Sequence, residues 1–224
     1  MEQTDIPLRS SKLKWVKQQL QNEYGIPKKR DRNPPLETLI KTVLSQNTTD
    51  LNRDRAWESL RKRFSSYEEM DKASSAEIAE SIKSGGLQHQ KAQTIKRILR
   101  TLRKTRGEYS LKYLENCSTE EVLNELESIK GVGRKTAAVV SLFALDKHYF
   151  PVDTHVRRVT SRLGLVSSGE NHHKVLNKLI PDKVKYQLHL QLIRHGREIC
   201  KARTPACDIC ILLERCLYGQ KRSP

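Results

Sequence analysis

One short stretch constrains the fold more than any other: two apolar segments joined by the tripeptide Gly131-Val132-Gly133. The residues before the tripeptide have the apolar spacing of a helix, and a second, strongly apolar helix is predicted to begin at Arg134. So tight a turn places backbone N–H groups beside a helix N-terminus, and its two glycines let another backbone or a phosphate approach closely. The sequence therefore predicts a phosphate-binding hairpin here.

Two candidate reactive residues follow the hairpin. Lys135 lies in the first turn of the predicted helix beside Arg134, where the positive end of the helix dipole and the adjacent cation both disfavour an ammonium group. Lys135 is therefore either a nucleophile or a phosphate contact, and the residues alone favour the contact. A loop through Pro151 leads to Asp153, which is either an active-site carboxylate or the N-cap of the next helix.

The rest of the chain reads as short helices. Apolar residues recur at helical spacing in many segments, and Ser74 with Glu77 and Ser118 with Glu121 form capping boxes. The predicted helices include residues 12–24, 35–46, 52–64 and 183–199. No alternating strand pattern of useful length occurs, so the predicted class is all-α.

Two polar turns between these helices hold further candidates. Gln46 lies in the segment Ser45 to Asp50, whose polar side chains either cap helix ends or reach into a groove. Leu87 is the apolar residue of an exposed-looking turn that spans residues 85–92. It either packs back onto the following helix or acts as a wedge that enters a stack of bases.

The charge of the chain favours a polyanionic partner. Its 224 residues carry 42 Lys and Arg against 26 Asp and Glu, a formal net charge of +16. Each phosphate that such a surface neutralises releases a counterion and strengthens association. No apolar run is long enough for a membrane span, and residues 1–15 lack a signal peptide's apolar core. We expect a soluble, intracellular protein that does not bind membranes.

Four of the five cysteines form the array C-x6-C-x2-C-x5-C, at Cys200, Cys207, Cys210 and Cys216. Four thiolates in so short a span hold either a zinc ion or a [4Fe–4S] cluster. Zinc modules usually pair two short knuckles and only one occurs here, which favours the cluster. Cys117 stands apart and is predicted to be a structural thiol.

The hairpin followed by Arg-Lys-Thr-Ala, Val-Asp-Thr-His eighteen residues after the lysine, and the cysteine array together resemble the endonuclease III family of base-excision DNA glycosylases. The resemblance covers residues 34–216. It implies a six-helix barrel at residues 33–148, with a helix-hairpin-helix motif at about 126–140. It also implies a second helical domain from residues 1–32 and 149–224 that carries a [4Fe–4S] cluster, with the active-site cleft between the two domains.

The resemblance also assigns roles to individual residues. Lys135 matches the Schiff-base lysine, Asp153 the catalytic aspartate, and the four cysteines of the array the cluster ligands. The implied DNA contacts are Gln46, which fills the space left by the flipped nucleotide, Leu87, which interrupts the opposite strand, and Gly131, Val132, Gly133 and Arg134 of the hairpin. The chain departs from the family at Lys130, where proline is common, and in the segment around Gln46.

The function that the resemblance implies is a bifunctional DNA glycosylase and AP lyase that removes oxidised pyrimidines from double-stranded DNA and cleaves at abasic sites. Two alternatives are a thymine or uracil mismatch glycosylase, which Lys135 argues against, and a non-catalytic iron–sulfur protein that senses damage. We expect a monomer, and the short N-terminus favours a prokaryotic cytoplasm or nucleoid.

Overall fold

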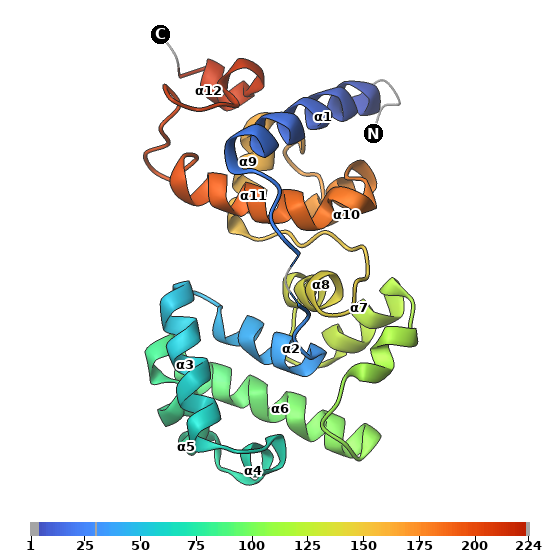
Figure 1. The fold of residues 1–224 in the computed structure, drawn as a ribbon, viewed down its shortest axis with the longest axis vertical. Helices are drawn as coiled ribbons and strands as arrows, with labels where there is room; N and C mark the ends of the chain where they lie inside the picture. Colours follow the sequence, from blue (N-terminus) through green and yellow to red (C-terminus); the bar gives the residue numbers. More distant parts are fainter. Residues whose placement is uncertain (1–4, 30, 223–224) are drawn as a thin grey trace. The chain divides into compact units, whose positions relative to one another are not determined.

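The structure, a computed structural model, describes residues 5–29 and 31–222. Within these ranges the chain forms helices and turns and no strand, which confirms the predicted all-α class (Figure 1). It divides into two compact units, Met1–Asp31 with His148–Pro224 and Arg32–Lys147, called the terminal and the central unit below. The limits expected from the sequence lie one residue from these.

The central unit is built around one long helix, α6. Helices α2, α4 and α5 all contact α6, while α8 packs on α2 and α7 (Figure 1). The core contains Leu39, Ile40, Ile95 and Ile98, all fully buried. The elements of this unit are α2 (Pro35–Leu44), α3 (Asp50–Arg63), α4 (Tyr67–Lys72), α5 (Ser75–Ser81), the 3-10 turn η1 (Lys83–Gly85), α6 (Gln88–Arg106), η2 (Lys112–Asn116), α7 (Thr119–Ser128) and α8 (Arg134–Phe143).

The terminal unit joins the two ends of the chain in one core. Val16 and Leu20 of its first helix pack in the same cluster as Val156 and Leu188, more than 120 residues later. None of the described helices combines the length and hydrophobicity that a membrane span needs. The elements are α1 (Asp5–Tyr24), α9 (Thr154–Leu163), α10 (His172–Leu179), η3 (Asp182–Val184), α11 (Lys185–Glu198), η4 (Leu213–Arg215) and α12 (Leu217–Gln220).

The structure differs from the sequence prediction mainly where tertiary contacts extend a helix. Helix α1 begins seven residues before the predicted residue 12. Its early turns are held by an ion pair from Arg9 to Glu170 at 2.7 Å and by a hydrogen bond from Lys12 to the carbonyl of Leu163 at 2.9 Å. Such partners are invisible to a periodicity argument. Both predicted capping boxes are present.

The predicted hairpin lies between α7 and α8, and its two glycines differ in backbone conformation and in the space around them. Gly131 has φ +103°, and a Cβ there would lie 2.5 Å from Oγ1 of Thr94 on α6. Gly133 is the N-cap of α8 with φ −102°, and a Cβ there would meet nothing within 4 Å. Gly131 is therefore required by the fold itself, whereas the space beside Gly133 is open.

We predict that Gly131→Ala lowers the free energy of unfolding by about 1 to 3 kcal/mol, because the substitution combines a left-handed backbone with a clash. Gly133→Ala is the matched control, and its unfolding free energy should stay within about 0.5 kcal/mol of the wild type. Chemical denaturation followed by circular dichroism measures both values. If the two substitutions lowered the free energy of unfolding equally, the fold would not depend on Gly131 more than on Gly133.

Candidate functional site

Lys135 occupies the first turn of α8, as predicted, and its side chain is half-buried. Its neighbour Arg134 forms an ion pair with Glu127 of α7, Nε to Oε1, at 2.7 Å. The carboxylate compensates the Arg134 charge, so the like-charge effect expected from the sequence is weaker than two adjacent cations would produce. The end of the helix dipole remains next to Lys135, because Gly133 caps the helix without a side-chain hydrogen bond.

The other predicted members of the hairpin contribute through the backbone. The side chain of Val132 is buried, and its N–H donates to the carbonyl of Ile129 at 2.9 Å. Val132 therefore braces the turn from inside. Gly131 and Gly133 are exposed, and so is Lys130, whose carbonyl accepts from Arg97 at 3.4 Å. The exposed surface of the hairpin therefore consists of main-chain atoms, with the cationic side chains of Lys130 and Arg134 beside them.

Asp153 is the N-cap of α9. Its Oδ1 accepts a hydrogen bond from the N–H of Val156 at 2.8 Å, and the residue is half-buried. The structural alternative raised by the sequence is thus confirmed. It does not compete with a chemical role, because the cap holds the carboxylate in one direction. Asp153 belongs to the terminal unit and Lys135 to the central unit.

His155, two residues after Asp153, contacts Arg158 of the same helix. Its Nδ1 lies 3.0 Å from Nη2 of Arg158. A guanidinium can only donate, so Nδ1 accepts and the ring is held in one tautomer. This contact gives His155 a structural role.

The two predicted DNA-contacting turns both belong to the central unit, one between α2 and α3 and the other directly before α6. Gln46 follows α2 in a turn that includes Asn47 at φ +50°, and Thr49 caps α3 by accepting from the N–H of Asn52. Leu87 has φ +50° and is 49% exposed. About half of its surface is therefore open to a partner, and both interpretations of this residue stay predictions.

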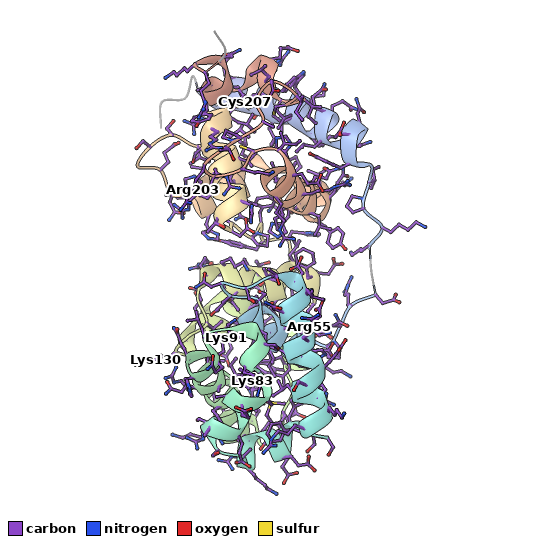
Figure 2. All side chains as sticks on the ribbon, turned by 90° about the vertical axis from the view of Figure 1, so that its left-hand side faces the viewer. Arg55, Lys83, Lys91, Lys130, Arg203 and Cys207 are labelled. Carbon is purple, nitrogen blue, oxygen red and sulfur yellow. The ribbon has the colours of Figure 1, made fainter. Side chains whose placement is uncertain are left out.

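Sequence reasoning missed one residue beside these turns, Lys91. The predicted exposed turn over residues 85–92 is wrong in its second half, because α6 begins at Gln88. Lys91, labelled in Figure 2, is only 1% exposed. Its Nζ donates to the carbonyl of Leu44 at 2.8 Å and to that of Gly85 at 2.7 Å. Burial lowers the pKa of Lys91 to about 8.

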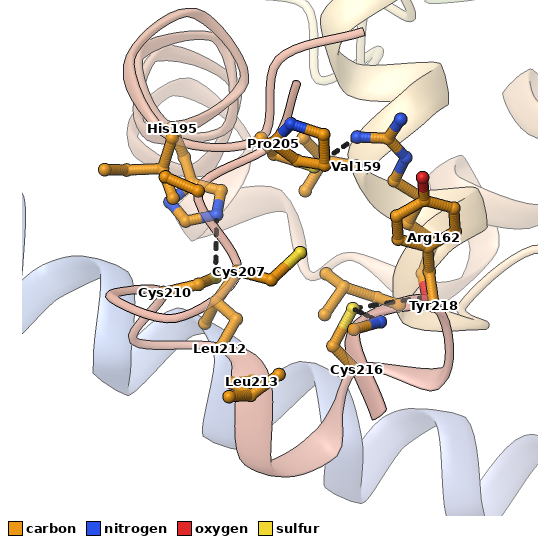
Figure 3. Close-up of a pocket in the computed structure, with 15 residues that line it drawn as sticks. Val159, Arg162, His195, Pro205, Cys207, Cys210, Leu212, Leu213, Cys216 and Tyr218 are labelled. Atoms are coloured by element: carbon orange, nitrogen blue, oxygen red, sulfur yellow. Dashed lines mark hydrogen bonds between the residues drawn. The ribbon is translucent and has the colours of Figure 1, made fainter. Parts of the chain in front are cut away.

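The four cysteines of the array line one pocket in the terminal unit, with a volume of about 360 Å³ that includes space open to solvent (Figure 3). All four are free thiols, and Cys207 and Cys216 point their sulfurs into the pocket. In the described part of the chain, no three His, Cys, Asp or Glu side chains converge tightly enough to hold a metal ion. The thiols surround a space and do not meet at a point.

The surroundings of the thiols disfavour an isolated thiolate, so an anionic sulfur there requires a cationic partner. Burial, with a smaller contribution from the neighbouring cysteines, raises the pKa of Cys210 to about 11, and burial raises that of Cys216. Donors nevertheless reach the sulfurs: the N–H of Gly219 reaches Cys216 and Nη1 of Arg162 reaches Cys200, both at 3.3 Å. Such donors are typical around cluster sulfurs, so these residues fit an iron–sulfur group.

Comparison with known proteins places the chain in a family. A model of the HhH-GPD superfamily of base excision DNA repair proteins matches residues 40–181. A putative DNA glycosylase of Arabidopsis thaliana is 40% identical over 80% of this chain, which spans 65% of that plant protein. Endonuclease III of Thermotoga maritima is 33% identical over 88% of this chain and 89% of its own length. Because one relative is from a plant, the expected prokaryotic source stays a prediction.

Solved structures agree with the sequence relatives. A trapped covalent intermediate of endonuclease III with DNA has a TM-score of 0.82 at 28% identity, covering 95% of this chain and 98% of that one. A thermostable thymine-DNA glycosylase has a TM-score of 0.78 at 24% identity, covering 94% and 98%, which is a likeness of fold alone. The chain therefore belongs to the HhH-GPD superfamily of base excision DNA repair proteins and, within it, to the endonuclease III family of DNA glycosylases.

Proposed function

We propose that this chain is a bifunctional DNA glycosylase and AP lyase that excises oxidised pyrimidines from duplex DNA. The observation that carries the proposal is a lysine in the first turn of α8, directly after the glycine hairpin of a family member. The endonuclease III that this chain resembles at TM-score 0.82 has been trapped as a covalent intermediate with DNA, which supports the same chemistry here.

The substrate base must first leave the duplex, because its sugar is unreachable inside the stack. Extrusion costs a few kcal/mol, and least for a lesion that already weakens its pairing. In the proposal, amides of the hairpin hold the phosphates during this step, since a helix N-terminus favours negative charge. Gln46 fills the space that the nucleotide leaves, and Leu87 enters the opposite strand.

Lys135 then acts as the nucleophile. Its neutral amine forms a bond to C1′ of the sugar, and the bond from C1′ to the base breaks, the base leaving with the electron pair and taking up a proton. Opening of the sugar ring produces an imine. The imine makes a C2′ proton acidic, and loss of that proton expels the 3′ phosphate by β-elimination. Water finally hydrolyses the imine and releases the amine of Lys135.

Asp153 serves the same reaction by charge. A carboxylate opposes the positive charge that develops on the sugar as the base departs, and it does so best where little water competes. It also takes up the proton that the Lys135 ammonium must lose before its neutral amine attacks. The hydrogen bond to Val156 supports this role, because it fixes the carboxylate before the substrate arrives.

We propose that Cys200, Cys207, Cys210 and Cys216 hold a [4Fe–4S] cluster. A single zinc ion binds thiolates at about 2.3 Å and draws them together at one point, whereas a four-iron cluster fills a space between its ligands. The pocket lined by the four thiols offers such a space. Because Cys200 follows α11 and the other three ligands lie in the C-terminal loop, a bound cluster would link this loop to the end of α11 and stabilise it.

Lys135→Ala should form no covalent adduct when borohydride is added to a reaction with abasic or thymine-glycol duplex, because no imine is available for reduction. The exposed Lys130→Ala is the control for a lost hairpin cation, and it should still be trapped. Gel electrophoresis after reduction measures the adduct. An adduct with Lys135→Ala would exclude it as the nucleophile, and cleavage of G·T or uracil duplexes in preference to thymine glycol would exclude the proposed substrate.

Asp153→Asn should keep the stability of the fold, because asparagine caps a helix about as well as aspartate. Removal of the charge should lower the single-turnover rate of base release by a factor of about 100 or more. Quenched-flow measurement with saturating enzyme gives this rate. A rate near that of the wild type would reduce Asp153 to its capping role.

Purified protein should contain four irons per chain and absorb near 400 nm, and Cys207→Ser should lose iron and lower the melting temperature, since ligand loss removes folding free energy. Cys117→Ser, outside the array, is the control and should keep its iron. A colourless protein with one zinc per chain would contradict the cluster.

A further inference from the structure

The two turns that the proposed function inserts into DNA are joined by one buried ammonium group. Leu44, whose carbonyl accepts from Lys91, ends α2 two residues before Gln46. Gly85, whose carbonyl also accepts from Lys91, ends η1 two residues before Leu87. One nitrogen atom thus binds the last carbonyl before each turn.

The second of these turns needs an external restraint. Gly86 and Leu87 have φ +67° and +50° in succession, and a left-handed conformation is unfavourable for a residue with a Cβ. Strained backbone of this kind persists only where its surroundings determine it. Lys91 restrains it twice, because its N–H also donates to the carbonyl of Leu87 at 3.0 Å.

The contact around Gly85 is close as well as polar. A Cβ at Gly85 would lie 3.3 Å from Cβ of Ala56 on α3 and 3.9 Å from Nζ of Lys91. The 3-10 turn therefore lies close to both α3 and the lysine. An apolar residue at position 91 would leave two buried carbonyls without this donor.

We propose that Lys91 is a positioning residue for base extrusion: it sets the Gln46 turn and the Leu87 turn in one fixed arrangement, so that both side chains enter the duplex together. This inference rests on the proposed function. It adds a residue that touches neither DNA nor the reacting sugar and acts through the backbone of both turns.

A second buried lysine on the same helix provides a matched control. Lys96 is 4% exposed and donates to the carbonyls of Asp71 and Ala73, at the end of α4 and before α5. Lys91→Met and Lys96→Met therefore remove the same group from comparable surroundings. Only the first loosens the two turns, so a purely structural role predicts similar behaviour of the two variants.

The test compares the two variants with the wild type in three assays: melting temperature, extrusion followed by 2-aminopurine placed opposite thymine glycol in stopped flow, and β-elimination on a single-stranded abasic oligonucleotide. We expect Lys91→Met to slow extrusion and to lower kcat/KM on the duplex by about 10- to 100-fold, since a displacement of about 1 Å costs this much. Its rate on the single strand, where nothing is extruded, should stay within about threefold of the wild type. Lys96→Met should match the wild type in both reactions at a similar loss of melting temperature.

Two results would overturn the inference: duplex kinetics of Lys91→Met equal to those of Lys96→Met, or an equal loss on duplex and single strand. If Lys91→Met does not fold, Lys91→Gln, which keeps one shorter donor, replaces it under the same criteria, with an intermediate loss on the duplex as the expected result. A wild-type protein inactive on both substrates would instead refute the proposed function, so the two failures are distinguishable.

Discussion

Short helices leave unpaired backbone groups at their ends, and the way each end is satisfied decides what this chain can do. Four N–H groups and four carbonyls per helix lack partners within the helix. Side chains close many ends, as Asp153 closes the N-terminus of α9 and Lys91 the C-terminus of α2. The N-terminus of α8 has only glycine as its cap. The residues proposed for phosphate binding and catalysis therefore gather at helix ends and not along helix faces.

Buried lysines satisfy main-chain carbonyls elsewhere in the fold. Lys91, Lys96 and Lys185 each donate to a main-chain carbonyl, and each residue is at most 4% exposed. Some of the lysines counted in the composition are therefore buried and cannot contact a partner. The net charge of +16 still favours DNA, but the exposed cations that carry this preference are fewer than the sequence count.

The hairpin shows how one motif divides its demands between structure and function. Gly131 is needed because its φ and its contact with Thr94 exclude a side chain. Gly133 satisfies neither condition, and a side chain there would project into open space. In the proposed function this space receives a phosphate. Two glycines that look equivalent in the sequence thus have different roles: Gly131 is needed by the fold, and Gly133 by the proposed phosphate binding.

The sequence by itself determined what depends on near neighbours: the all-α class, the two capping boxes, the turn at Gly131 to Gly133 and the spacing of the cysteines. These follow from residues a few positions apart, so periodicity and local hydrogen bonds are sufficient to predict them. Only the tertiary structure decided that Leu87 is exposed, that Lys91 is buried and that Glu127 pairs with Arg134. The burial of Lys91 depends on carbonyls supplied by Leu44 and Gly85, and no local pattern reports a partner 47 residues away.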